Sequence, residues 1–224
     1  MNILVTGASG GLGTAIIRAM SETGMVTPAC FRGSVGTVSG VANALSNTVR
    51  FDVRDADSIA KALPNPCFDI VINNAGVALS GLLQDYSYQQ IADIVNTNLV
   101  GTMLVTKHCL PYMLRQKKGA VVNVSSIWGI DGSACETVYS AAKAGIIGFT
   151  KALAKEVGLS GVTVNAVAPG MLDTPMTREY SDNDKQNFAE STMLGKNPTI
   201  DEVAELIRYL ATNSAISGEI IRIG

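Results

Sequence analysis

The sequence predicts an α/β fold: a single doubly wound domain over residues 1–224, with a mostly parallel seven-stranded sheet and helices on both faces. Three observations predict this class. Short apolar runs alternate with longer helical stretches from end to end, which favours parallel strands joined by right-handed crossovers. A glycine-rich turn follows the first apolar run, and no linker, repeat or low-complexity tract divides the chain.

The elements follow one another in a regular order. Strands are expected at residues 3–6, 25–31, 48–51, 68–72, 120–124, 162–167 and 219–223, and helices at about 12–22, 88–117, 139–157 and 201–212. The run at 68–72 is nearly all apolar, as expected of a strand covered on both faces. The irregular, polar segment 171–198 leaves the sixth strand at the edge where this fold binds ligands, so we expect either a surface loop or a mobile substrate lid there.

Composition excludes several classes of protein. The formal net charge is −2 and no basic block is present, so neither nucleic acid nor a membrane surface is an expected partner. The N-terminus lacks the features of a signal peptide, and no apolar run approaches the roughly 18–20 residues of a membrane span. Cys30, Cys67, Cys109 and Cys135 are scattered and His108 is the single histidine. We therefore expect no metal site, thiols that are buried or half-buried, and a cytoplasmic protein.

The glycine-rich turn at residues 6–13 predicts a dinucleotide site of the Rossmann type. Gly7, Gly11 and Gly13 let the backbone turn tightly, approach a pyrophosphate and pack the helix against the sheet. The following helix N-terminus offers free N–H groups to the phosphates. The same segment also fits a spacing through Gly10, so the spacing alone leaves the subgroup of this fold open.

The end of the second strand indicates which dinucleotide is bound. A site that prefers NAD(H) places a carboxylate there, to hold the ribose hydroxyls. Residues 29–33 contain no acid and one arginine, Arg32. A guanidinium suits a 2′-phosphate, and we therefore expect NADP(H) to be preferred over NAD(H). The alternative is that Arg32 is an ordinary surface residue.

Tyr139 and Lys143 lie one helical turn apart on the same helix face. An adjacent cation favours the phenolate and is expected to move the Tyr139 pKa from about 10 toward 7. This spacing alone is common on solvated helices. Polar segments at 122–126, 73–76 and 168–170, however, end three neighbouring strands at the same carboxyl edge. The fold thus collects these groups where it binds its ligand.

These motifs together resemble the compact short-chain dehydrogenase/reductase family, over essentially the whole chain. The N-N-A-G motif and the short chain favour the compact over the extended subgroup, and the family's spacing to Tyr139 selects Ser126 over Ser125. The matching segments are T-G-A-S-G-G-L-G at 6–13, Asp52-Val53, N-N-A-G at 73–76, Asn98 within V-N-T-N-L-V-G, Ser126, Tyr139, Lys143, P-G at 169–170 and Thr174.

The resemblance implies four catalytic residues. Tyr139 would be the general acid that donates to the carbonyl oxygen while hydride arrives from the nicotinamide. Lys143 would lower the pKa of Tyr139 and hold the ribose. Ser126 would hydrogen-bond the substrate oxygen, and Asn98 would support a water-mediated proton relay to Lys143.

The resemblance also implies a set of cofactor contacts. Asp52 and Val53 would meet the adenine, residues 74–76 would border the adenosine, and Leu172 and Thr174 would hold the carboxamide. The full set of candidate cofactor-binding residues is Thr6, Gly7, Ser9, Gly11, Leu12, Gly13, Arg32, Asp52, Val53, Asn74, Ala75, Gly76, Tyr139, Lys143, Pro169, Gly170, Leu172 and Thr174.

Within the family, the chain looks most like the 3-oxoacyl-acyl-carrier-protein reductases of fatty-acid biosynthesis. Segments 164–177 and 216–224 carry this likeness, although the sequence ends at Gly224 without the short tail usual in that group. The implied substrate is a 3-oxoacyl thioester, on acyl carrier protein or coenzyme A, and the implied assembly is a homotetramer or homodimer. Alternatives are another small ketone, a sugar or a steroid-like alcohol. A non-catalytic redox sensor would have lost the Tyr, Lys or Ser.

The loop at 128–136 is individual to this chain. Trp128 is expected either to wall a substrate pocket or to pack in the interior. Glu136 is expected to be a solvated carboxylate at a helix entry rather than to face the site.

Overall fold

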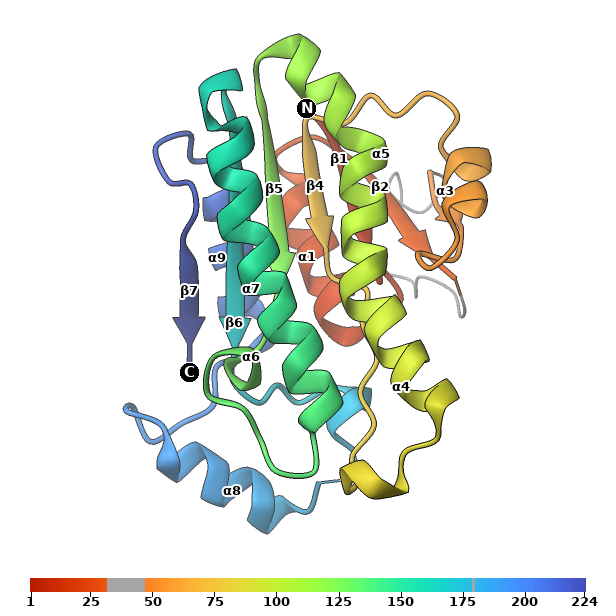
Figure 1. The fold of residues 1–224 in the computed structure, drawn as a ribbon. Coiled ribbons are helices and arrows are strands. Elements are labelled where there is room, and N and C mark those ends of the chain that lie inside the picture. The colour runs from red at the N-terminus through yellow and green to blue at the C-terminus, as the bar shows by residue number, and fades with distance from the viewer. Residues whose placement is uncertain (32–46, 179) are drawn as a thin grey trace.

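The described residues form a seven-stranded sheet in which every strand pair is parallel (Figure 1). This computed structural model describes residues 1–31, 47–178 and 180–224. The strand order is β3-β2-β1-β4-β5-β6-β7, and it confirms the predicted doubly wound α/β class. The strands are β1 (Asn2–Thr6), β2 (Met25–Cys30), β3 (Val49–Arg50), β4 (Ile70–Asn73), β5 (Gly119–Val124), β6 (Val162–Pro169) and β7 (Ile220–Ile223).

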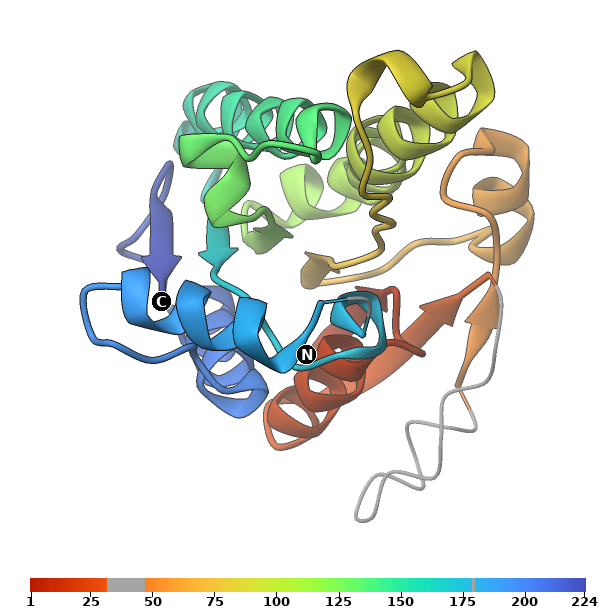
Figure 2. The ribbon, with the colours of Figure 1, turned by 90° about the horizontal axis from the view of Figure 1, so that it is seen from below.

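Helices cover both faces of the sheet (Figure 2). One face carries α1 (Gly11–Ser21) and α9 (Ile200–Thr212), which pack against each other. The opposite face carries α3 (Ala56–Ala62), α4 (Tyr88–Val95), α5 (Gly101–Gln116) and α7 (Thr137–Val157). Two further helices, α6 (Ile127–Asp131) and α8 (Asp182–Ser191), lie beyond the carboxyl ends of the strands (Figure 1). These two elements border the edge where ligands are expected.

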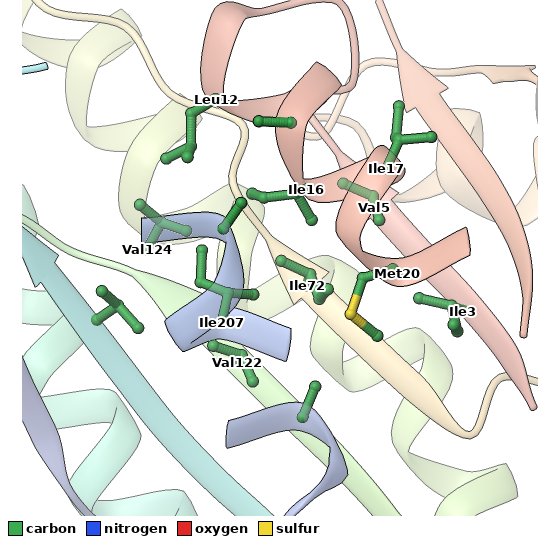
Figure 3. Packing of buried hydrophobic residues seen from close by; sticks show 14 of the residues in the cluster. Ile3, Val5, Leu12, Ile16, Ile17, Met20, Ile72, Val122, Val124 and Ile207 are labelled. Atoms are coloured by element: carbon green, nitrogen blue, oxygen red, sulfur yellow. The ribbon is translucent and has the colours of Figure 1, made fainter. Parts of the chain in front are cut away.

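The core is split into two layers by the alternation of side chains along each strand. In β1, Ile3 and Val5 point into the layer under α1 and α9, whereas Leu4 points into the layer under α5 and α7. Figure 3 shows the first layer, where Ile16 of α1 and Ile207 of α9 meet the strands. Both faces of β1 are therefore apolar, which fixes the strand in the middle of the sheet.

The region at 88–117, predicted to be helical throughout, contains two helices joined by a π-helical turn at Asn96–Val100. The turn carries Asn98, which is completely buried. The Asn98 side-chain N–H donates to the carbonyls of Ile94 and Val77, both at 2.8 Å. The widened turn thereby fixes a polar side chain inside the protein. The spacing of apolar residues in the sequence does not predict this turn.

The helix α3 was missed by the sequence prediction. It begins after Asp55, whose carboxylate accepts the backbone N–H groups of Asp57 and Ser58 at 2.9 and 3.2 Å. An N-cap of this kind satisfies otherwise unpaired donors and stabilises a short helix.

The prediction of irregular structure throughout 171–198 was wrong for residues 182–191, which form α8. Ser181 and Asp184 form a capping box, in which the Ser181 hydroxyl accepts the Asp184 N–H and the Asp184 carboxylate accepts the Ser181 N–H, both at 3.1 Å. The box starts a helix despite the polar composition.

The cysteines differ in their exposure. Cys30 and Cys109 are buried, and burial raises the pKa of the Cys109 thiol to about 12. Cys67 and Cys135 are exposed, so the expectation of buried or half-buried thiols was wrong for these two, which lie in loops. In the described part of the chain, no helix combines the length and the apolar character needed to cross a membrane.

Replacing Ile207 by alanine tests the core beneath α9. The change leaves a cavity beside Val122 and Val124 (Figure 3), and we expect the free energy of unfolding to fall by about 2–5 kcal/mol. Urea denaturation measures the change. The matched control is Leu159→Ala, at an exposed leucine, which should alter stability by about 0.5 kcal/mol or less. Equal effects of the two substitutions would contradict the packing described here.

Candidate active site

The turn between β1 and α1 approaches the end of β4 so closely that side chains are excluded. Gly7 has a φ of +65°, and a Cβ there would lie 2.7 Å from the Ala75 Cα. A Cβ on Gly13 would lie 2.2 Å from the Gly7 carbonyl oxygen. Both distances are far below van der Waals contact, so this backbone path requires glycine. The first turn of α1 is thereby held at the carboxyl edge of the sheet.

Two polar side chains hold the ends of β1 and β4 together. The Thr6 hydroxyl accepts the backbone N–H groups of Asn74 and Ala75, both at 3.1 Å. The Asn74 side chain donates back to the carbonyls of Thr6 and Gly7, also at 3.1 Å. Thr6 and Asn74, two predicted cofactor residues, therefore also shape the turn.

A large cavity, here called the main cavity, opens between this turn, the ends of β5 and β6, and the segment before α8. Because it lies beside the point where the strand order reverses, it is where open α/β sheets bind ligands. Among the predicted site residues, those lining it are Gly7, Ser9, Gly11, Leu12, Gly13, Asn74, Gly76, Ser126, Tyr139, Lys143, Pro169, Gly170, Leu172 and Thr174.

A second cavity adjoins the first and shares Gly7, Ser9 and Gly76 with it. It is lined by Asp52, Val53 and Ala75, and by Phe31 on one side. The predicted adenine contacts Asp52 and Val53 thus line the second cavity, and the predicted nicotinamide contacts Leu172 and Thr174 line the adjoining main cavity.

Arg54 in the second cavity was missed by the sequence analysis. Its guanidinium donates to the Asp52 carboxylate at 2.7 to 3.0 Å and to the Asp93 carboxylate at 2.8 Å. The hydrogen bond to Asp52, followed by the Coulomb attraction of the two carboxylates, raises the pKa of Arg54 despite partial desolvation. Asp52 is therefore held in a fixed orientation. Arg32, the predicted reader of the 2′-phosphate, lies outside the described residues.

Tyr139 and Lys143 lie side by side on α7, facing the main cavity. The Lys143 Nζ lies 5.4 Å from the centroid of the Tyr139 ring and donates to the Val124 carbonyl at 2.8 Å. Burial lowers the pKa of Lys143 to about 8. The Ser126 hydroxyl lies against the Tyr139 phenol. Residues from β5 and α7 thus meet at one point.

The pKa of Tyr139 is raised, mainly by burial and next by the charge of Glu136, whereas contact with the Ser126 hydroxyl lowers it. The expectation that Lys143 would bring this pKa toward 7 was therefore wrong for the protein alone. In a low-dielectric interior, desolvation of the phenolate outweighs a cation that is bound to the Val124 carbonyl.

Asn98 and Lys143 together face the space beside Gly76. A Cβ at Gly76 would lie 2.6 Å from the Asn98 Oδ1 and 3.5 Å from the Lys143 Nζ. Among the described residues, none donates to that Oδ1, although it is buried. A buried acceptor without a donor costs free energy, and a hydroxyl or water that donates to the Asn98 Oδ1 would remove this cost. Together with the glycine turn, the site therefore fits a bound dinucleotide.

Trp128 walls the main cavity and packs at the same time. Its ring meets Tyr139 edge-on at a centroid distance of 6.1 Å and lies 6.2 Å from Tyr180. Glu136 also lines the cavity and is only 3% exposed, so the expectation of a solvated carboxylate was wrong. The segment before α8 contacts it through the Tyr180 hydroxyl, and sequence patterns do not reveal such a long-range contact.

The chain belongs to the short-chain dehydrogenase family, and the comparison with known proteins confirms the resemblance drawn from its motifs. The model of that family, described as short chain dehydrogenase, matches residues 1–185. The protein is therefore an oxidoreductase, and the reading as a non-catalytic sensor is not supported.

Similar proteins include three bacterial 3-oxoacyl-[acyl-carrier-protein] reductases. The reductase from Vibrio harveyi is 36% identical, over 98% of this chain and 94% of its own length. The one from Aquifex aeolicus is 35% identical, with the same two shares. The one from Synechocystis sp. is 37% identical, over 95% of this chain and 89% of its own length.

A solved structure shows the same fold. The ligand-free aldohexose dehydrogenase of Thermoplasma acidophilum superposes with a TM-score of 0.89, covering 99% of this chain and 91% of that chain. Sequence identity is 24%, so this likeness concerns the fold.

Replacing Lys143 by methionine should stabilise the protein at pH 7. The substitution removes the cost of burying a charge but also loses one hydrogen bond, so we expect a net gain in the free energy of unfolding of about 1–2 kcal/mol. The folded-state pKa of about 8 lies below the ordinary 10.5, so the unfolded chain binds the proton more tightly. This penalty is fully present below pH 8 and disappears as the pH rises toward 10.5. Urea denaturation at pH 7 and 9.5 should show a gain that shrinks at the higher pH.

The matched control for this prediction is Lys155→Met, at an exposed lysine on the same helix. It should change stability little at either pH. A Lys143→Met variant that is less stable than the natural protein at pH 7 would contradict the desolvation argument.

Proposed function

We propose that the protein reduces a ketone to a secondary alcohol with NADP(H), and that the ketone is a 3-oxoacyl thioester. The observation that carries the reaction class is the meeting of Ser126, Tyr139 and Lys143 in the main cavity, beside the glycine turn. The substrate class is supported by relatives named as 3-oxoacyl-[acyl-carrier-protein] reductases, 33–37% identical over nearly the whole chain.

The chain's own residues would bind and orient the two reactants. The glycine turn and the N-terminus of α1 would hold the pyrophosphate, while Lys143 would hold the ribose beside Gly76. Leu172 and Thr174 would contact the carboxamide, and Asp52 and Val53 the adenine. When bound, the nicotinamide supplies the hydride.

Tyr139 would donate a proton to the carbonyl oxygen. Its raised pKa keeps the phenol protonated at neutral pH, which is the state that a general acid needs at the start of ketone reduction. The Ser126 hydroxyl would donate to the same oxygen and polarise the carbonyl. Once the proton has moved, the Lys143 ammonium would stabilise the phenolate, and a water between Lys143 and Asn98 would return a proton.

An acyl chain would enter between Trp128 and the segment 171–198, which together border the main cavity. The thioester would be carried on acyl carrier protein or coenzyme A. Association as a homotetramer or homodimer would involve the helices at 88–117 and 139–157. The alternative substrates, another small ketone, a sugar or a steroid-like alcohol, share the same proton transfer and differ in the group that this space accepts.

The cofactor preference is tested by Arg32→Asp. The change replaces an attraction for the 2′-phosphate by repulsion, so the ratio of kcat/KM for NADPH over NADH should fall at least about tenfold. Absorbance at 340 nm follows both cofactors with an acetoacetyl thioester. Arg50→Asp is the control, since Arg50 is an exposed arginine of β3. An unchanged ratio in Arg32→Asp would remove Arg32 as the reader of the phosphate.

The general acid is tested by Tyr139→Phe. Loss of the proton donor should lower kcat for acetoacetyl thioester reduction by roughly 100- to 10,000-fold. NADPH affinity, measured by the quenching of Trp128 fluorescence, should change little, since only the hydroxyl is removed. Tyr209→Phe, on the exposed Tyr209 of α9, should leave both quantities unchanged. Substantial residual turnover in Tyr139→Phe would mean that another group is the acid.

A further inference from the structure

A buried carboxyl group stands beside the reacting position. Glu136 directly precedes α7, three residues before Tyr139, and is 3% exposed. It lines the main cavity together with Ser126 and Tyr139. The proton transfer proposed above gives this group no role.

Tyrosine side chains lie near the Glu136 carboxylate. The Tyr180 hydroxyl donates to its Oε1 at 3.0 Å. Its negative charge contributes, after burial, to raising the pKa of Tyr180, Tyr139 and Tyr86. Trp128 lies 6.1 Å from Tyr139 and 6.2 Å from Tyr180, between ring centroids. The carboxylate therefore lines the same cavity as Tyr139 and these aromatic rings, and its charge acts on the Tyr139 phenol.

This arrangement matters for what the cavity accepts. A carboxylate oxygen accepts more than one hydrogen bond, so a donor on the substrate can bind Glu136 in addition to the Tyr180 hydroxyl. A methyl group in the same place offers no hydrogen bond to this buried charge and is therefore less favourable there. A hydroxyl or amide N–H in the same place donates to the charge and is favoured.

We propose that Glu136 is a specificity-determining residue, which selects ketones with a hydroxyl or N–H donor next to the reacting carbonyl over ketones that are apolar there. The inference rests on the proposed function in one respect, that Tyr139 protonates a ketone in the main cavity. It does not depend on the thioester, and among 3-oxoacyl thioesters it favours those with a hydroxyl on carbon 4. A purely structural Glu136, which only ties the Tyr180 segment to α7, would instead affect all ketones alike.

The test compares substrates that differ only in a hydroxyl replaced by a methyl group. One pair is 1-hydroxy-2-butanone and 3-pentanone. The other pair is the 4-hydroxy-3-oxobutanoyl and 3-oxopentanoyl thioesters of N-acetylcysteamine. The ratio of kcat/KM within each pair is followed by NADPH oxidation. In the natural protein, the hydroxylated member should be favoured at least about tenfold, the effect of one hydrogen bond to a charged group.

Three variants separate recognition from structure. Glu136→Leu should lower the ratio at least about tenfold, because the charged acceptor is replaced by an apolar group. Glu136→Gln, which is nearly isosteric, should give an intermediate ratio and carries the test if the leucine variant does not fold. Glu156→Leu is the matched control, at an exposed glutamate of the same helix, and should keep the natural ratio.

The outcomes distinguish this inference from the thioester proposal. Equal kcat/KM values within the pairs of the natural protein, or a ratio that neither Glu136 variant alters, overturn the role of Glu136 even if thioesters are good substrates. Reduction of the free ketones with the expected ratios, but of neither thioester, supports the role of Glu136 and overturns the thioester proposal alone. Loss of rate without a change of ratio marks Glu136 as structural.

Discussion

Close contact between the β1–α1 turn and the end of β4 is the constraint on which the site depends. Gly7 allows an approach to β4 that any side chain would prevent, and Gly13 allows the turn to fold back on Gly7. The Thr6 hydroxyl holds the two strand ends with a pair of hydrogen bonds. The strand order reverses at this point, so the chain leaves the sheet in two directions and opens the space that both cavities occupy. The same contact therefore determines the fold and the position of the site.

The candidate catalytic residues illustrate how the chemistry of a site and the stability of the fold oppose each other in this protein. Lys143 is buried with its pKa lowered to about 8, and Asn98 keeps a buried oxygen that no described residue satisfies. Both features cost stability in the protein alone. The large apolar layers on the two faces of the sheet compensate for them, which is a common relation between a scaffold and its site.

The family likeness and the individual features of the chain lie in different places. The glycine turn, Ser126, Tyr139 and Lys143 follow the motifs of the short-chain dehydrogenase family. Glu136 lies in the loop between β5 and α7 and is covered by the segment before α8. The family motifs therefore lie at the strand ends and on α7, whereas the features individual to this chain lie in the segments that cover them.

The sequence by itself determined the elements whose signal is local. Alternating apolar runs indicate the strands, the glycine spacing at 6–13 the turn, and Tyr139 and Lys143 their shared helix face. Only the tertiary structure decided the burial of Glu136, the π-turn that buries Asn98, the Arg54 hydrogen bonds across two segments, and the raised pKa of Tyr139. The reason is physical: burial and electrostatics depend on neighbours that are distant along the chain, whereas periodicity and spacing depend on residues a few positions apart.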